Sequence, residues 1–265
     1  MWTTLTLLSV LAAAPAETGL SLKHARSTHG LLGPRRRDDT VAPGDIFFVC
    51  FDIAGIRVDA EGKVRYRMGM ELSDAEGKVV FQQAAKEQDV HASLGGDRVP
   101  AYAHLSVGLD TPPGDYRMKV VVHDLASGRE QSLSRKIKVL AKDFALVRTT
   151  VALDEDAQYP VAAFVCGQAV WVHTSVVEFA RGRGKQANIV LRMRVLDESG
   201  KPTLAKAATD TLSEDVPANL SGLPMALPLT LNRSGKFTVE LLAHDRVSGK
   251  KARVSFPLVV QGAAE

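Results

Sequence analysis

The chain has 265 residues, of which 45% are apolar and 24% are charged, and its formal net charge is +3. At roughly 100–150 residues per domain the length predicts about two domains, and the composition is ordinary for a globular protein. The small net charge gives no indication of a nucleic-acid partner, and no apolar run reaches the roughly 20 residues that a transmembrane helix needs.

The N-terminus is typical of an export signal. Residues 2–14 are apolar or small and carry no charge, and Ala14-Pro15-Ala16 has the small-x-small pattern of a secretory cleavage site. We therefore expect residues 1–16 to be a signal peptide, with Glu17 as the first residue of a periplasmic or secreted protein. Because the segment lacks a Lys or Arg before its apolar stretch, a buried first strand or a misplaced start codon remains the alternative.

The remainder of the chain contains an internal repeat. Residues 44–78 align without a gap with residues 167–201, and residues 114–139 align with residues 235–260. Turn residues match turn residues, and apolar positions match apolar positions, as expected when one domain is duplicated. The identical pairs are Gly44/Gly167, Val49/Val172, Met70/Met193, Asp74/Asp197, Gly77/Gly200, Lys78/Lys201, Gly114/Gly235, His123/His244, Asp124/Asp245, Ser127/Ser248, Gly128/Gly249, Ser134/Ser255 and Val139/Val260.

Both copies alternate apolar and polar residues along three segments. The sets at every second position, all apolar except for Thr174, are in chain order Phe47/Val49/Phe51/Ile53, Tyr66/Met68/Met70/Leu72 and Tyr116/Met118/Val120/Val122, then Val170/Val172/Thr174/Val176, Ile189/Leu191/Met193/Val195 and Phe237/Val239/Leu241/Ala243. A period of two predicts β-strands with one face on a core and the other in water. Only residues 83–90 look compatible with a short helical turn.

Glycine-containing turns separate these segments at similar places in both copies, such as Asp74–Lys78 and Asp197–Lys201. Short strands with turns every 8–12 residues are typical of a β-sandwich. We therefore predict an all-β protein with one antiparallel β-sandwich over residues 17–140 and a second over residues 144–261. The connector of residues 141–143 is so short that it predicts limited freedom between the two domains.

The segments Pro112-Pro113-Gly114-Asp115-Tyr116 and Gly235-Lys236-Phe237 resemble the entry to the penultimate strand of bacterial immunoglobulin-like and fibronectin III-like modules. In that resemblance Tyr116 takes the place of a tyrosine corner, where the hydroxyl ties a loop to the strand. Phe237 cannot make this hydrogen bond. The resemblance implies tandem immunoglobulin-like domains with a binding or scaffolding role, and it identifies no ligand.

The two cysteines, Cys50 and Cys166, lie in different copies at positions that are not equivalent. A disulfide within one domain is therefore impossible, and a bridge between the domains would require a close approach that the sequence does not reveal. We expect two unpaired thiols.

The dipeptides His123-Asp124 and His244-Asp245 recur at the same place in both copies. They are candidate metal or ligand sites. Alternatively, each Asp caps a turn and each His is the outward-facing end of a strand. A metal site usually needs three or four converging ligands, and the sequence has no close His or Cys cluster to supply them, so we expect no metal and no cofactor.

Phe48 and Trp171 occupy equivalent positions and are predicted to point away from the two cores. Outward aromatic rings can bind a sugar or a neighbouring protein, although packing between domains or under a loop is the simpler interpretation. Basic side chains at alternate strand positions, such as Arg65 and Arg67, indicate a solvated sheet face or a stripe for an anionic polysaccharide or membrane surface.

No nucleophile motif, phosphate-binding loop or dinucleotide fingerprint occurs in the sequence. We therefore expect no enzymatic activity and no catalytic residues. The sequence favours an exported binding or structural protein of the cell envelope or exterior, whose partner is an unknown protein or polysaccharide. The alternatives are a pair of carbohydrate-binding modules that use Phe48 and Trp171, and an exported chaperone or assembly factor that lends a sheet edge to a partner strand.

Overall fold

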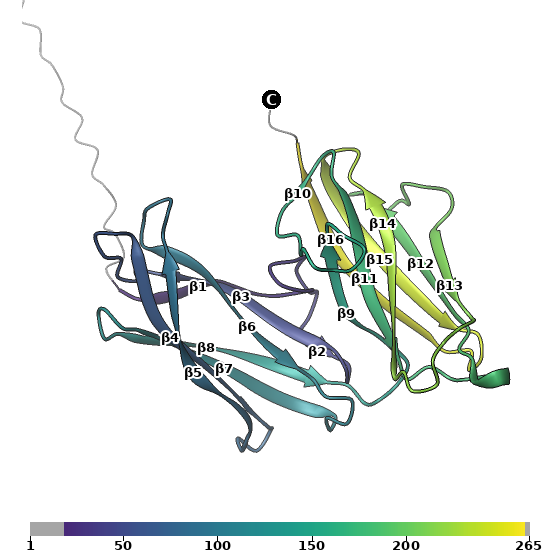
Figure 1. The fold of residues 1–265 in the computed structure, drawn as a ribbon, viewed down its shortest axis with the longest axis horizontal. Helices are drawn as coiled ribbons and strands as arrows, with labels where there is room; N and C mark the ends of the chain where they lie inside the picture. Colours follow the sequence, from purple (N-terminus) through teal and green to yellow (C-terminus); the bar gives the residue numbers. More distant parts are fainter. Residues whose placement is uncertain (1–18, 263–265) are drawn as a thin grey trace, which may run out of the picture.

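The computed structural model describes residues 19–262 and consists of β-strands joined by turns and loops, with one short 3-10 helix, η1 (Arg183–Lys185), in these residues (Figure 1). The strands of the first half are β1 (Ser21–Thr28), β2 (Thr40–Val41), β3 (Ile46–Ala54), β4 (Lys63–Ser73), β5 (Val79–His91), β6 (Arg98–Ser106), β7 (Gly114–Asp124) and β8 (Glu130–Val139). Those of the second half are β9 (Ala145–Ala152), β10 (Phe164–Val165), β11 (Ala169–Val177), β12 (Ile189–Leu196), β13 (Ala208–Leu212), β14 (Gly222–Thr230), β15 (Gly235–Asp245) and β16 (Lys251–Gln261). The expected signal peptide lies outside the described residues.

The two halves have the same topology. In the first, a three-stranded sheet in the order β1-β3-β6 faces a five-stranded sheet in the order β2-β8-β7-β4-β5. In the second, the order β9-β11-β14 faces β10-β16-β15-β12-β13, so every strand has its counterpart eight strands later. Neighbouring strands are antiparallel except for the short pairs β2/β8 and β10/β16. This is the immunoglobulin-like sandwich, and it confirms the predicted fold class.

Each sandwich encloses its own hydrophobic core. The alternating residues of β3 and β11 are its centre: Phe47, Val49 and Ile53 are fully buried, as are Val172 and Val176. Between these positions the side chains of the same strands point to the outer face of the sheet. The period of two in the sequence therefore predicted which residues fill the cores.

The suggestion of a helical turn over residues 83–90 was wrong, because these residues belong to β5, the longest strand of the part that the structure describes. β5 pairs with β4 along its length, and the register shifts between Met68 and Met70. There Gly69 approaches Ala85 so closely that a Cβ at Gly69 would lie 3.2 Å from the Ala85 Cβ. The strand is exposed on both faces, so its sequence lacks the alternation that identified the other strands.

The turns behave as the sequence predicts. Gly77 and Gly200 have φ angles of 84° and 80°, in the left-handed region that glycine adopts without strain. The Tyr116 hydroxyl donates to the Pro112 carbonyl oxygen over 2.9 Å, which completes a tyrosine corner.

Hydrogen bonds connect the two sandwiches at a junction centred on Asp45 and Arg148. The main-chain N–H of Arg148 donates to Asp45 Oδ1 over 2.7 Å, and Arg148 Nε donates to the Gly44 carbonyl oxygen over 3.0 Å. The other oxygen of Asp45 accepts from Arg36 over 2.6 Å, in an ion pair whose two side chains are each 7% exposed. A buried, fully hydrogen-bonded pair of this kind holds one geometry, because any departure leaves a charge without its partner.

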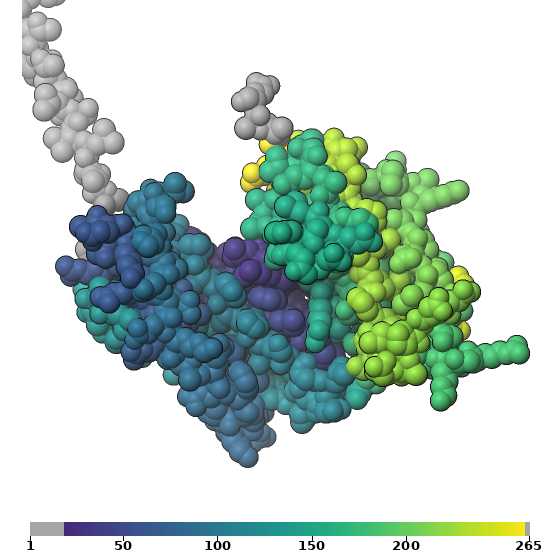
Figure 2. Space-filling view, in the orientation of Figure 1, coloured from purple at the N-terminus to yellow at the C-terminus, as the bar shows by residue number. Residues whose placement is uncertain are grey.

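The connector itself is held by ion pairs on both sides of the junction. Lys142 Nζ lies 3.2 Å from Asp110 of the first domain and 3.5 Å from Glu178 of the second, and Asp143 pairs with Lys250 over 2.6 Å. Beyond these contacts the domains diverge and leave a hollow between them (Figure 2).

Candidate functional site

Each domain has a groove between its two sheets, at the open side where neither sheet is covered by a further strand. The first-domain groove lies beside β5 and β6 and has a volume of about 670 Å³. The second-domain groove lies beside β12, β13 and β14 and has a volume of about 550 Å³. At least eight lining positions of one groove are equivalent to lining positions of the other: Leu72/Val195, Val80/Thr203, Phe81/Leu204, Leu105/Leu229, Ser106/Thr230, Val107/Leu231, Tyr116/Phe237 and Val139/Val260.

The grooves share an apolar floor but differ in the sign of their charges. The charged residues that line the first are Asp74, Glu76 and Asp115, all acidic. Those that line the second are Arg194, Lys206 and Arg233, all basic. The two domains therefore carry grooves at equivalent positions whose lining residues have opposite charges.

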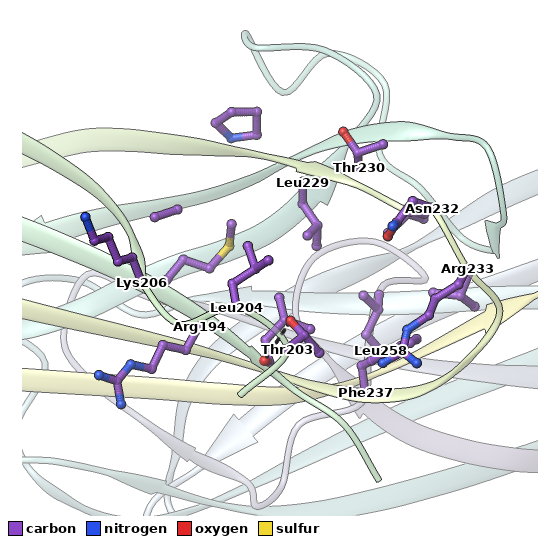
Figure 3. Close-up of a pocket in the computed structure, with 16 residues that line it drawn as sticks. Arg194, Thr203, Leu204, Lys206, Leu229, Thr230, Asn232, Arg233, Phe237 and Leu258 are labelled. Atoms are coloured by element: carbon purple, nitrogen blue, oxygen red, sulfur yellow. Dashed lines mark hydrogen bonds between the residues drawn. The ribbon is translucent and has the colours of Figure 1, made fainter. Parts of the chain in front are cut away.

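Figure 3 shows how the basic residues are arranged around the second-domain groove. Arg233 lies beside Phe237 at one end, while Arg194 and Lys206 lie at the other, with Leu204 between the two ends. The Arg233 guanidinium carbon is 5.0 Å from the centre of the Phe237 ring, so a cation takes the place of the hydrogen bond that Tyr116 makes in the first domain.

One acidic residue stands close to this basic groove. Asp197, in the neighbouring turn, has a pKa below its usual value because it accepts hydrogen bonds from Ser199 and Lys201 and lies near Arg233. Its carboxylate already receives the Ser199 hydroxyl over 2.6 Å and the Lys201 main-chain N–H over 3.0 Å. Asp197 keeps its negative charge, but it is not among the residues that line the groove, whose charged lining residues are Arg194, Lys206 and Arg233.

The first-domain groove adjoins the free edge of β5. This strand ends its sheet, and it has 13 residues, whereas its counterpart β13 has five. Its first three residues, Val79, Val80 and Phe81, are 49%, 49% and 46% exposed. At the opposite edges of the two five-stranded sheets, the two-residue strands β2 and β10 shorten the edge that a further strand could join.

Two of the three basic residues of β4 have acidic partners on the neighbouring strand. Lys63 and Arg67 pair across the sheet with Asp89 and Glu87 of β5, over 2.8 and 2.9 Å. In the second domain, Arg181 donates to main-chain carbonyl oxygens, including that of Pro217. These side chains therefore have structural partners.

In each His-Asp dipeptide the Asp side chain accepts hydrogen bonds that stabilise the turn after the strand. Asp124 is fully buried and accepts hydrogen bonds from the Ser127 hydroxyl, from the Ala126 main-chain N–H and from the main-chain N–H of Arg57 in a distant loop. Burial alone would raise the pKa of Asp124, but these hydrogen bonds outweigh it and hold the pKa below its usual value. His123 is half-buried, 3.9 Å from Glu130.

Asp245 repeats this arrangement in the second domain. Its carboxylate accepts from the Ser248 hydroxyl, from the Val247 main-chain N–H and from the main-chain N–H of Ala180. Its pKa is likewise below the usual value, because the hydrogen bonds outweigh the effect of burial. The sequence identified the turn but missed the third partner, which comes from a loop 65 residues away.

The two outward aromatic residues, Phe48 and Trp171, are both half-buried on the outer faces of their sheets. Phe48 belongs to a cluster of rings, with its centroid 5.5 Å from His104 and 6.4 Å from Tyr102. Trp171 and its neighbour His173 lie opposite Pro228 and Ala226, so the second domain has no aromatic residue at the positions of His104 and Tyr102. The alternation of Pro100, Tyr102 and His104 on β6 was the overlooked sign of this cluster.

The thiols of Cys50 and Cys166 are unpaired. Cys50 is buried, with its sulfur 3.4 Å from the Thr28 hydroxyl oxygen. Within residues 19–262 no three His, Cys, Asp or Glu side chains come together closely enough to hold a metal ion. Nor does that part of the chain contain a helix of the length and apolar character needed to cross a membrane.

No known family model matches the chain, and no curated protein matches its sequence. Among solved structures, it is similar to red sea bream transglutaminase, with 12% identity over 92% of this chain and 31% of that one, at a TM-score of 0.29. The C-terminal domain of the Streptococcus agalactiae AgI/II polypeptide BspA has 10% identity over 89% of this chain and 99% of that one, at a TM-score of 0.30. Dimeric latent PorU from Porphyromonas gingivalis has 9% identity over 97% of this chain and 21% of that one, at a TM-score of 0.39. These similarities assign no function.

Proposed function

We propose that the protein is a non-enzymatic, exported binding protein that holds an extended segment of a partner against the free edge of β5. The observation that supports this proposal is the long uncovered edge directly beside an apolar groove. The main-chain groups along this edge can form a hydrogen-bonded ladder with an added strand, and the groove can receive one of its side chains.

The chemistry of the edge indicates which segment fits. Val79, Val80 and Phe81 give an apolar start to the strand, and Asp74, Glu76 and Asp115 surround the adjoining groove. A partner segment that carries an apolar residue between basic ones would satisfy both features.

The non-enzymatic part of the proposal rests on how the buried acids are used. Asp124 and Asp245 each accept several hydrogen bonds within the protein, and Asp45 is engaged by Arg36 and Arg148. Carboxylates engaged in this way by the protein's own donors stabilise the fold, and their hydrogen-bonding capacity is used within the chain. Export remains an expectation from the residues before Glu17.

The proposal can be tested with a displayed library of short peptides and residues 17–265 as the bait. We expect selected peptides to contain an apolar residue flanked by Lys or Arg, and Val80→Lys to weaken their binding about tenfold or more. Val259→Lys is the matched control, because Val259 is 54% exposed and lies outside both grooves. Methylating the backbone nitrogens of a selected peptide should abolish binding. Binding that survives both changes would contradict edge addition.

A second candidate function is favoured by the ring cluster of Phe48, Tyr102 and His104. Tyr102 is 42% exposed, and aromatic faces of this kind can stack against the apolar face of a sugar ring. Titration calorimetry with envelope polysaccharides tests it: Tyr102→Ala should remove binding, while Tyr159→Ala, at a site that is 67% exposed, should not. Equal binding by both variants would reject this candidate.

A further inference from the structure

The second domain carries an exposed leucine between two lysines. Leu204 is 71% exposed in the segment before β13, and Lys201 and Lys206 beside it are exposed as well. The Thr203 main-chain N–H donates to the Val195 carbonyl oxygen over 2.9 Å, which anchors the start of the segment, and Leu204 follows as an exposed residue of the second-domain groove. An apolar side chain flanked by basic ones is the kind of segment that the first-domain groove is suited to receive.

We infer that the occupant of the first-domain groove is a second copy of this chain, which inserts Leu204 and its flanking lysines. This inference rests on the proposed function, since it names the partner for the same edge and groove. Lys201 and Lys206 would approach Asp74, Glu76 and Asp115, while Leu204 would enter the apolar floor beside Phe81. Opposite charges at the rim then set the orientation of the contact.

The signs of the charges select unlike domains. Two first domains brought together would place acidic rims against each other, and two second domains would place Lys206 against Arg194 and Arg233. Repulsion between like charges opposes both arrangements. When a first domain faces a second domain, the acidic residues of one groove lie against basic residues of the other domain and attract them. The edges of β5 and β13 are both free to extend one sheet into the next.

The contact requires two chains. Neither groove is lined by a residue of the other domain, and the domains of one chain meet instead at the junction of Asp45 and Arg148. If two chains make this contact reciprocally, they form a two-fold dimer, and if each chain passes it on to the next, the contact is heterologous and gives a ring or a filament.

Sedimentation velocity of residues 17–265 over a range of concentrations tests the inference. We expect association that weakens as sodium chloride is raised, because the rim charges are exposed to solvent. Leu204→Ser should weaken association about tenfold or more. Leu94→Ser is the matched control, since Leu94 is 103% exposed in another loop and should leave association unchanged.

A charge exchange makes the test specific. Glu76→Lys and Lys206→Glu should each weaken association, and a mixture of the two variants should regain it, because the first domain of one then meets the second domain of the other with opposite charges restored. Lys136→Glu, at an exposed position away from both grooves, is the control for net charge. Association with no rescue in the mixture would overturn the inference.

The failure of this inference can be told apart from the failure of the proposed function. A chain that stays monomeric at every concentration yet binds library peptides at β5 would overturn the second copy as occupant and leave the edge as a binding site. A synthetic peptide of residues 201–212 provides a direct probe, and we expect it to bind the chain and to lose binding to Glu76→Lys. A chain that neither associates nor binds any peptide would overturn both.

Discussion

The Asp45 carboxylate of the first domain accepts the main-chain N–H of Arg148 in the second, over 2.7 Å and across 103 residues of sequence. Arg148 donates this hydrogen bond from a left-handed conformation, with φ of 53°, at an irregularity in the pairing of β9 with β11. The same carboxylate holds the buried Arg36. One side chain thus links an ion pair inside the first domain to the backbone of the next.

Asp45→Ala should therefore destabilise the protein by about 3–5 kcal/mol, because it leaves Arg36 buried without a counter-charge. We also expect a broader distribution of domain orientations in small-angle X-ray scattering. Asp110→Ala, which removes a 95%-exposed partner of Lys142, should change the free energy of unfolding by at most about 0.5 kcal/mol. Similar effects of the two substitutions would mean that the buried pair does not fasten the junction.

His29 makes stability depend on pH. It is buried at the junction with its ring 5.5 Å from Phe256, and burial together with nearby Arg36 lowers its pKa from 6.5 to about 3. Because the unfolded chain binds a proton that the folded chain excludes, stability should be complete above pH 6.5 and fall by about 1.4 kcal/mol per pH unit below it. Urea unfolding between pH 5 and 7 should show this slope, and His29→Phe should flatten it by that amount. An unchanged slope in the variant would place the titrating group elsewhere.

The cores predict a contrast between two strand positions. Val172 is fully buried between the sheets, so Val172→Asp should cost about 3–5 kcal/mol by burying a charge without a partner. Arg65 points outward, and Arg65→Ala should cost about 0.5 kcal/mol or less. Thermal unfolding measures both, and equal shifts in Tm would contradict the assigned strand faces.

The turn acids should contribute to stability above the pKa of an unfolded aspartate. Hydrogen bonds hold the pKa of Asp124 and that of Asp245 below the usual value of 3.8, so their contribution is lost only as the pH falls through these lowered values. Asp124→Ala and Asp245→Ala should each cost about 2–3 kcal/mol at pH 7, since each leaves buried N–H donors unsatisfied. His123→Ala and His244→Ala should cost much less, and chemical denaturation at pH 7 will separate the two pairs.

Alternation in the sequence predicted β3, β4 and β7 and their counterparts, because one face of each is buried and the other is solvated. It could not predict β5, whose two faces are both exposed. Part of the apolar floor of each groove could be predicted from the sequence, because the internal repeat aligns Tyr116 with Phe237. The reversal of charge around it was not, because turn residues such as Asp115 and strand residues such as Arg194 come together only in the fold.

The fixed junction has a consequence for any partner that engages both domains. Asp45, Arg148 and the ion pairs of the connector restrict how far the two grooves can move apart. The distance between the two grooves is therefore kept nearly constant. A partner with two matching segments at the right spacing gains avidity, because its second segment meets the second groove at a high effective concentration. A partner with the same two segments at another spacing gains none, so distance becomes part of what the protein recognises.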